Sequence, residues 1–251
     1  SVQDNDNILT GGAGLDVITG GTGIDTLVGG AGADTITGGG GVDTITGGLG
    51  NDVIVLTEST QVSDSVVYEV RAEDAAVSND AITDFKVGAT ADGSDQIDIT
   101  LGTVGQFHDA AGVTDITLIN IDDAGVNVVN IAEATKIATV TGAFDGADLT
   151  AKSNILNVNL TGNIANEAAL QEALEIGGLA EMTMDGAVVA KDAILVTYDN
   201  GTDSFLAFVE FAAGVSADAQ AADGALTATN LFTFTGVADS STLVAANFDF
   251  I

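Results

Sequence analysis

Five aspartates recur at intervals of nine residues near the start of this 251-residue chain. They are Asp16, Asp25, Asp34, Asp43 and Asp52. Carboxylate and backbone carbonyl oxygens are hard ligands, and a flexible set of them suits calcium rather than zinc or copper. The chain has no Cys and one His, which excludes a thiolate site or a site with two imidazoles. The spacing therefore predicts a series of calcium sites.

The aspartates belong to a nonapeptide that begins at Gly11 and has Gly at its first, second and fourth places, Asp at the sixth and Ile or Leu at the eighth. A partial unit precedes the array, with Asn7 in the place of the Asp. Glycine allows the tight turn in which backbone carbonyls converge. The second and fourth glycines are therefore the expected carbonyl ligands: Gly12, Gly14, Gly21, Gly23, Gly30, Gly32, Gly39, Gly41, Gly48 and Gly50.

Short strands must position these turns. A β-branched segment follows each Asp, and its one large apolar residue is expected to point inward. Those inward residues are Ile18, Leu27, Ile36, Ile45 and Ile54. Two units then form one 18-residue coil of a parallel β-roll, so that aspartates 18 apart face each other. The expected pairs are Asp16 with Asp34, Asp25 with Asp43 and Asp34 with Asp52, and Asn7 with Asp25 forms an incomplete site.

This nonapeptide resembles the RTX (repeat-in-toxin, haemolysin-type) calcium-binding repeat. Residues 1–55 are accordingly expected to form an RTX β-roll with bound Ca²⁺ ions. One departure from the family pattern concerns the fifth place of the unit, which is often polar in the family. Here it holds Leu15, Ile24, Ala33 and Val42 before Asn51, so the turn surface could be a packing face.

Residues 56–100 lose the nine-residue period but resemble the segment that follows the roll in RTX exoproteins. There the segment caps the open end of the roll, where unpaired strand groups would otherwise pair with another chain. Phe85, Ile97 and Ile99 are the expected apolar plug. Asp80, Asp84, Asp95 and Asp98 all belong to this segment, and each could instead be a solvated turn acid. Asp80 and Asp84 are the ones expected as additional calcium ligands.

Residues 101–251 predict a β-rich (α+β) domain, so that the whole chain is mostly β. Short strands are expected at 114–121, 126–131, 137–141 and 155–160. Asn166–Gly178 has the pattern of a capped helix, and Asp199-Asn200-Gly201 predicts a hairpin turn within Ala193–Phe211. The last residues, about 231–251, resemble the C-terminal signal of type I secretion substrates, although an edge strand would have the same pattern.

The charge of the chain excludes several kinds of partner. Its 37 acidic residues against 5 basic ones give a formal charge of −32, which opposes binding to nucleic acid or anionic lipid. No apolar run is long enough for a transmembrane span. The chain also lacks a recognisable catalytic motif, so no enzymatic activity is expected. His108 is interpreted as a surface or capping residue and the acid pair Asp122-Asp123 as part of a solvated turn.

The resemblance implies a secreted protein that a Gram-negative bacterium releases through type I secretion machinery and that folds when it meets extracellular calcium. Two functions fit such a module. The first is part of a self-assembling surface-layer protein, favoured by the composition of the remaining chain. The alternative is the secretion and folding module of an RTX exoenzyme, such as a protease, lipase or epimerase, or of an adhesin.

Overall fold

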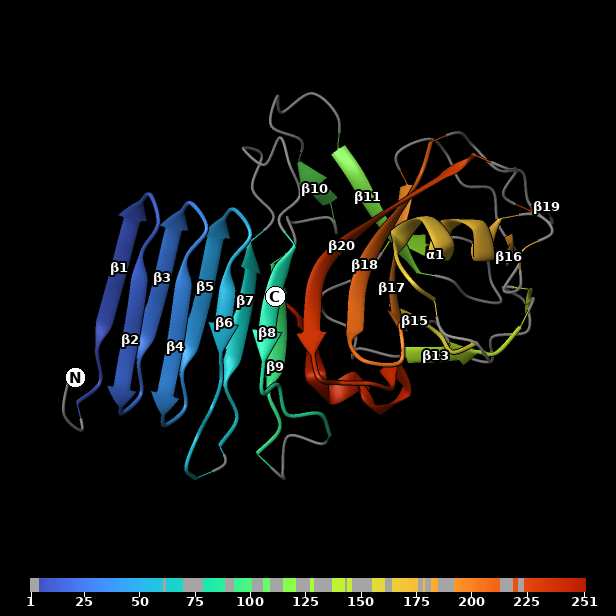
Figure 1. The fold of residues 1–251 in the computed structure, drawn as a ribbon. Helices are drawn as coiled ribbons and strands as arrows, with labels where there is room; N and C mark the ends of the chain where they lie inside the picture. Colours follow the sequence, from blue (N-terminus) through green and yellow to red (C-terminus); the bar gives the residue numbers. More distant parts are fainter. Residues whose placement is uncertain are drawn as a thin grey trace.

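The computed structural model describes a two-sheet β-roll at the amino-terminal end that joins a larger curved sheet at the other end (Figure 1). Mostly β structure, as the sequence predicts, is confirmed. The residues that the structure describes are 5–60, 62–69, 79–88, 93–100, 106–108, 115–120, 127–128, 137–142, 144–145, 155–160, 164–175, 178, 182–184, 192–212, 219–220 and 224–251. The predicted acid pair at 122–123 lies outside them, as does the side chain of His108.

Each nonapeptide contributes one strand to the roll. Odd-numbered strands pair in one sheet and even-numbered strands in the other, always in parallel. The register places Leu27 between Leu9 and Ile45, which is the shift of one 18-residue coil that the sequence predicts. The strands are β1 (Ile8–Ala13), β2 (Val17–Thr22), β3 (Thr26–Ala31), β4 (Thr35–Gly40), β5 (Thr44–Leu49) and β6 (Val53–Val55).

The interior of the roll is a stack of aliphatic side chains. Leu27, Ile36, Ile45 and Ile54 are fully buried, and Ile18 near the open end is almost so. Because successive side chains of a strand point to opposite faces, the residues on either side of each buried one face solvent. One large apolar residue per nonapeptide is therefore enough to fill the narrow space between the two sheets.

Three more strands continue the roll after the last nonapeptide, although the sequence has lost its period there. They are β7 (Ser65–Glu69), β8 (Asp80–Thr83) and β9 (Gln96–Thr100). Strand β7 pairs in parallel with β5 and β9, and β8 pairs in parallel with β6. Phe85, Ile97 and Ile99 are buried as predicted. This part of the 56–100 segment therefore extends the roll instead of closing it.

Strands from the far end of the chain close the roll. Strand β20 (Leu226–Thr235) pairs in parallel with β8, and β21 (Phe248–Phe250) pairs in parallel with β9. In Figure 1 the carboxyl terminus accordingly lies beside β8 and β9. A strand at the edge of a sheet exposes unpaired N–H and C=O groups. Both sheets of the roll thus acquire a partner strand whose position in the sequence is remote.

The remaining elements form the β-rich part that the sequence predicts. The hairpin turn at Asn200 and Gly201 connects two antiparallel strands whose register ends at Asp199 and Ser204. The predicted helix begins after its Asn166 cap and buries Leu170 and Leu174. The elements are β10 (Gln106–His108), β11 (Asp115–Asn120), β12 (Asn127–Val128), β13 (Ile137–Val140), β14 (Phe144–Asp145), β15 (Ile155–Val158), α1 (Glu167–Leu174), β16 (Met182–Met184), β17 (Asp192–Asp199), β18 (Ser204–Phe211), β19 (Ala219–Gln220), η3 (Ser240–Thr242) and η4 (Ala245–Asn247).

One apolar core runs from the roll into this part. It joins Ile36 and Ile54 to Leu206, Phe232 and other side chains of the carboxyl-terminal sheet. A second core lies on the opposite face of β17 and β18, beneath α1. The predicted domain boundaries at residues 55 and 100 stay predictions. The 12-stranded sheet and this core both contain described residues from either side of each boundary.

Candidate metal-binding turns

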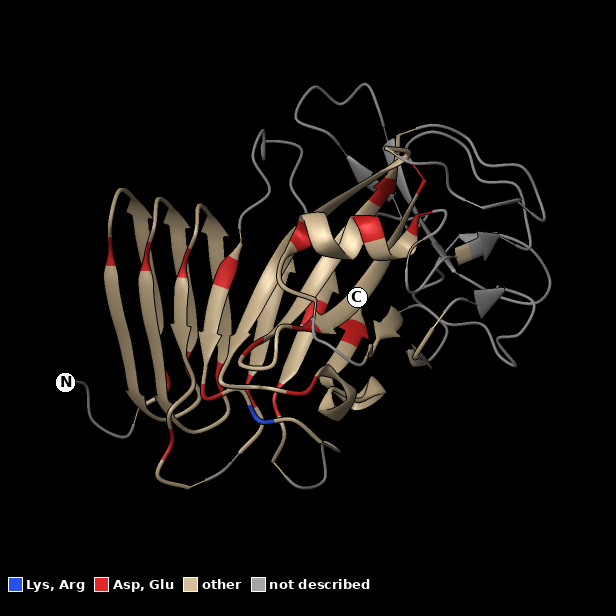
Figure 2. Cartoon of the chain, turned by 45° about the vertical axis from the view of Figure 1, so that its right-hand side comes forward, with Lys and Arg blue, Asp and Glu red and all other residues tan. Residues whose placement is uncertain are grey.

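The turns between the strands form two rows, one along each side of the roll. Each turn ends in an Asp, or in Asn7 before β1, at the start of the next strand, and Figure 2 shows acidic residues at the same level on successive coils. We call these rows the first and second ladders. The first ladder contains Asp16, Asp34, Asp52 and Asp80, and the second contains Asn7, Asp25, Asp43, Asp64 and Asp95.

Each ladder is connected by a repeated hydrogen bond. The backbone N–H of Asp16 donates to Oδ1 of Asp34 at 2.8 Å, and the N–H of Asp34 donates to Oδ1 of Asp52 at 2.8 Å. In the second ladder the N–H of Asp25 donates to Asp43 at 2.9 Å. The predicted pairs of aspartates 18 residues apart are therefore brought together. One carboxylate oxygen of each acceptor is used by this bond.

The second carboxylate oxygen has no donor. Oδ2 is buried without a hydrogen-bond partner in six ladder residues: Asp16, Asp25, Asp34, Asp43, Asp52 and Asp64. Leaving a buried polar atom unpaired is unfavourable, and for a charged group the penalty is larger. A repeated orphan oxygen at equivalent positions points to a positively charged group that would satisfy all of them.

Three first-place glycines, Gly11, Gly20 and Gly29, bring a backbone carbonyl to the same point. Oδ2 of Asp34 and the carbonyl oxygen of Gly47 both lie 2.5 Å from where a Cβ on Gly29 would sit. Oδ2 of Asp16 and the carbonyl of Gly29 have the same relation to Gly11, at 2.7 and 2.6 Å. Two acceptors therefore converge where a side chain would not fit. This donor set of carboxylate and carbonyl oxygens fits Ca²⁺.

The second and fourth glycines, which the sequence predicts as carbonyl ligands, lie in the stacked turns. Nine of these ten residues have positive φ, the exception being Gly23. The turns stack so closely that a Cβ on Gly32, whose φ is +131°, would collide with the carbonyl oxygen of Gly14. The N–H of Gly14 donates to the carbonyl of Ala31 at 2.6 Å. These carbonyls thus lie between successive coils at the turn rows.

Burial raises the pKa of several ladder carboxyls. Burial is the largest cause in each, and it raises the pKa of Asp43, Asp52 and Asp95 to about 6. The pKa of Asp64 rises to about 8 through burial and then through the charges of Glu58, Asp95 and Asp43. Among the residues that the structure describes, Lys86 is the one Lys or Arg. Protein cations therefore neutralise few of these acids in the described region.

The other predicted ligands divide into two groups. Asp80 is a ladder residue, because its Oδ1 accepts the N–H of Asp52 at 3.0 Å. Asn7 occupies the ladder position expected of it, and its backbone N–H and Nδ2 donate to Oδ1 of Asp25 at 2.7 and 2.8 Å. Asp84 lies outside both ladders, at a φ of 62°, and accepts a hydrogen bond from the hydroxyl of Thr57.

The predicted ligands include neither Asp64 nor Asp95, which the sequence also allows to be a solvated turn acid. Both are buried, and their Oδ1 atoms accept ladder hydrogen bonds from Asp43 at 2.8 Å and from Asp64 at 3.1 Å. A local signal identifies them. Every ladder Asp stands two residues before a buried aliphatic residue, as Asp64 does before Val66 and Asp95 before Ile97. The intervals of 21 and 31 residues concealed this signal in a search for a fixed period.

Backbone and water oxygens must complete any such site. Within the described part of the chain, no three acidic or imidazole side chains lie together in an arrangement that could hold a metal ion. This agrees with turns in which each carboxylate is joined by carbonyl oxygens. None of the described helices has the length and apolar character needed to cross a membrane.

The sequence of these turns identifies their class. The family model of the RTX calcium-binding nonapeptide repeat matches residues 3–23 and 19–54, with 4 copies. Residues 3–54 therefore consist of RTX nonapeptide repeats, which bind calcium. RTX repeat proteins are typically secreted by Gram-negative bacteria. No curated protein and no solved structure is significantly similar to the chain.

Proposed function

We propose that this chain is a calcium-triggered folding module of a type I secreted protein and that it forms part of a self-assembling surface layer. The observation that carries the proposal is the repeated buried Oδ2 atom that lacks a donor and lies beside a glycine carbonyl. Without a cation these carboxylates repel one another and are desolvated. With calcium the same oxygens become ligands, so binding and folding are coupled.

The energies are of the size that such a switch needs. Extracellular calcium modules have dissociation constants of about 10⁻⁴–10⁻³ M. Three sites at tenfold excess of calcium would add about 4 kcal/mol to the stability of the folded state. Domains are stable by only about 5–15 kcal/mol. Calcium outside the cell can therefore decide whether the roll is folded, while the chain stays unfolded and exportable inside.

The carboxyl-terminal strands support this order of events. A type I secretion signal at about 231–251 would have to be accessible during export. In the folded chain β20 pairs with β8, and both Phe248 and Phe250 of β21 are buried. The signal is then available before folding, and afterwards its strands are paired with β8 and β9 of the roll. Folding thus follows export, in our proposal, because the same residues serve both steps.

Apolar side chains on the turn surface support self-assembly. Leu15 is 81% exposed and Ile24 60% exposed, each at the fifth place of its nonapeptide. Exposed apolar surface favours association with another protein surface. We therefore propose a structural role for the described residues in preference to catalysis.

Circular dichroism with calcium and with EGTA tests the folding switch. We expect the β signal to be lost in EGTA and regained when calcium is restored. Magnesium at the same concentration is the control, because Mg²⁺ requires a tighter octahedral site. An unchanged β signal in EGTA would contradict the proposal.

Electron microscopy tests the assembly. We expect sheets or filaments with calcium and none in EGTA, and we expect Leu15→Ser together with Ile24→Ser to reduce them while the circular dichroism is unchanged. A protein that folds with calcium but stays monomeric at all concentrations would favour the folding module of an exoenzyme instead.

A further inference from the structure

The coil that follows the last nonapeptide has an unusual turn. Residues 56–64 replace the glycine-rich turn in the second ladder, and they lengthen the interval between ladder residues to 21, from Asp43 to Asp64. The turn before it would bind a cation less well than the regular turns. Oδ2 of Asp43 lies 2.7 Å from where a Cβ on Gly38 would sit, but no carbonyl oxygen is among the three atoms nearest that point.

Glu58 lies in the segment that replaces the glycine-rich turn. Oε2 of Glu58 accepts a hydrogen bond from the N–H of Val62 at 2.9 Å, and this bond holds the carboxylate inside its own loop. The N–H of Gly41 in the preceding turn also faces the carboxylate. Burial raises the pKa of Glu58, and the N–H groups of Val62 and Gly41 oppose this rise. Its other oxygen, Oε1, is buried without a partner.

Asp64 presents a second orphan oxygen in the same coil. Its side chain is 1% exposed, Oδ1 accepts the N–H of Asp43 at 2.8 Å, and Oδ2 is buried without a partner. Among the neighbouring charges, that of Glu58 raises the pKa of Asp64 most. No basic side chain is among the groups that act on Asp64. Both side chains thus face the 41–43 segment of the preceding turn, Glu58 toward the N–H of Gly41 and Asp64 toward the N–H of Asp43, and each has one buried oxygen that lacks a donor.

We propose that Glu58 and Asp64 form a further calcium site, outside the nonapeptide repeats, in which a glutamate carboxylate replaces the missing glycine carbonyl. Oε1 of Glu58 and Oδ2 of Asp64 supply two ligands, and carbonyl oxygens and water complete the coordination, as is usual for calcium. The choice of calcium as the ion rests on the proposed function. The position of the site rests on the two buried oxygens that lack a donor, Oε1 of Glu58 and Oδ2 of Asp64.

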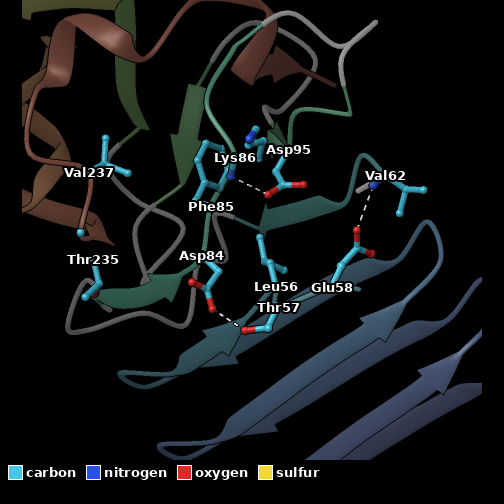
Figure 3. A pocket seen from close by; sticks show the side chains of 11 residues that line it. Leu56, Thr57, Glu58, Val62, Asp84, Phe85, Lys86, Asp95, Thr235 and Val237 are labelled. Carbon is cyan, nitrogen blue, oxygen red and sulfur yellow. Dashed lines mark hydrogen bonds between the residues drawn. The ribbon is translucent and has the colours of Figure 1, made fainter. Parts of the chain in front are cut away.

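A cavity borders Glu58 of this site. A hollow of about 430 Å³ opens between the irregular coils and the end of β20, and its lining includes Glu58, Asp95 and Val237. Figure 3 shows Glu58 bonded to Val62 on one side of the hollow and Asp95 bonded to the backbone nitrogen of Lys86 on another. A hydrated cation can therefore reach Glu58 without opening the roll.

Counting bound ions by native mass spectrometry of the full chain tests this site. We expect Glu58→Gln and Asp64→Asn each to bind one calcium ion fewer than the wild-type chain. Both substitutions keep the size of the side chain, and Asn at 64 retains an oxygen for the N–H of Asp43. The double variant should also lose one ion only, because both residues serve one site. Glu172→Gln, at an exposed position of α1, is the matched control and should bind the full number.

Calorimetry separates this site from those in the repeats. We expect Glu58→Gln to weaken one class of sites about tenfold or more and to leave the others unchanged. Asp16→Asn, in the first ladder, should lose a different ion, so that its combination with Glu58→Gln loses two. If the wild-type chain binds calcium but Glu58→Gln binds the same number with the same affinity, the further site is wrong. If the wild-type chain binds no calcium, the proposed function fails instead.

Discussion

The regular coils and the irregular coils of the roll build the same ladder from different sequences. In the nonapeptides the ladder residues are 18 apart, as in Asp16 and Asp34. In the irregular coils the intervals are 21, 28 and 31 residues, and the last of these joins Asp64 to Asp95. The hydrogen bond from N–H to Oδ1 is nevertheless the same. What is repeated in space is the Asp before each buried strand residue, and the length of the connecting turn is free to vary.

The two regions differ in what holds the turn. Glycine backbone packs against glycine backbone in the nonapeptides, so the turn has no room for side chains. In the irregular coils side chains perform this task, as Glu58 does for Val62 and Asn247 does for the 86–95 loop. The first arrangement depends on close backbone stacking and the second on hydrogen bonds from particular side chains. Each of the following substitutions acts on one arrangement.

The largest effect is expected from Gly32→Ala in the regular coils. A Cβ there would collide with the carbonyl oxygen of Gly14, and φ is +131°. Gly14→Ala is the matched control, since its φ is +117° but nothing lies within 4 Å of the added Cβ. Strained φ alone should lower the unfolding free energy by about 1–3 kcal/mol, and Gly32→Ala should lower it further. Chemical denaturation in saturating calcium measures both, and equal losses would mean that stacking between coils is unimportant.

Asn247→Ala tests the irregular coils. Nδ2 of Asn247 donates to the carbonyls of Asp95 at 2.8 Å and Lys86 at 3.3 Å, and its Oδ1 accepts the N–H of Gly88 at 3.2 Å. Removing the amide leaves several of these buried groups unpaired, so we expect a loss of about 1–3 kcal/mol. Hydrogen exchange should show faster opening of β9 and β21.

The control for this variant is Asp249→Asn on the exposed face of β21, which should leave the unfolding free energy nearly unchanged. If Asn247→Ala is as stable as this control, the tail does not hold the 86–95 loop.

A comparison within the first ladder measures the importance of position. Asp34 accepts the N–H of Asp16 and itself contributes an orphan oxygen, whereas Asp16 belongs to the outermost coil. Asp34→Ala should therefore raise the calcium concentration at the midpoint of folding more than Asp16→Ala, by several-fold. Titration of calcium followed by circular dichroism gives both midpoints, and the reverse order would contradict the ladder as a series of coupled sites.

Protonation of the buried carboxyls should partly replace calcium in stabilising the folded chain. We expect this effect to be larger in the irregular coils than in the nonapeptides. The folded chain holds protons on Asp43, Asp52 and Asp95 up to a pKa of about 6 and on Asp64 up to about 8, whereas an unfolded Asp has a pKa near 4. Since the folded state binds more protons in this range, its stability without calcium falls as pH rises from about 4 to 8. We expect β signal without calcium at pH 5 that is lost by pH 8.

Asp64→Asn gives this acid prediction its control. The variant lacks the group with the highest pKa, so the dependence on pH between 6 and 8 should become flatter than in the wild-type chain. A β signal without calcium that does not change between pH 5 and 8 would show that burial of these carboxyls has little effect on folding.

The sequence by itself determined the regular coils. Their period gave the positions of Asp16 to Asp52, the inward Ile and Leu residues and the shift of 18 between paired strands, because each unit repeats the same local conformation. It also predicted the helix after Asn166 and the hairpin turn at Asn200 and Gly201, which rest on short-range hydrogen bonds. In all of these, the decisive contacts lie within one unit or repeat identically from one unit to the next.

Only the tertiary structure decided how the roll ends and which irregular turns lie next to each other in its ladders. Strand β20 meets β8 and β21 meets β9 across about 150 residues of chain, and no local pattern specifies such a pairing. Asp95, two residues before the buried Ile97, accepts a ladder hydrogen bond, whereas Asp84, two residues before Lys86, bonds to Thr57. Long-range strand pairing sets which turn lies beside which, and hence which buried oxygens lack a donor and can take a cation.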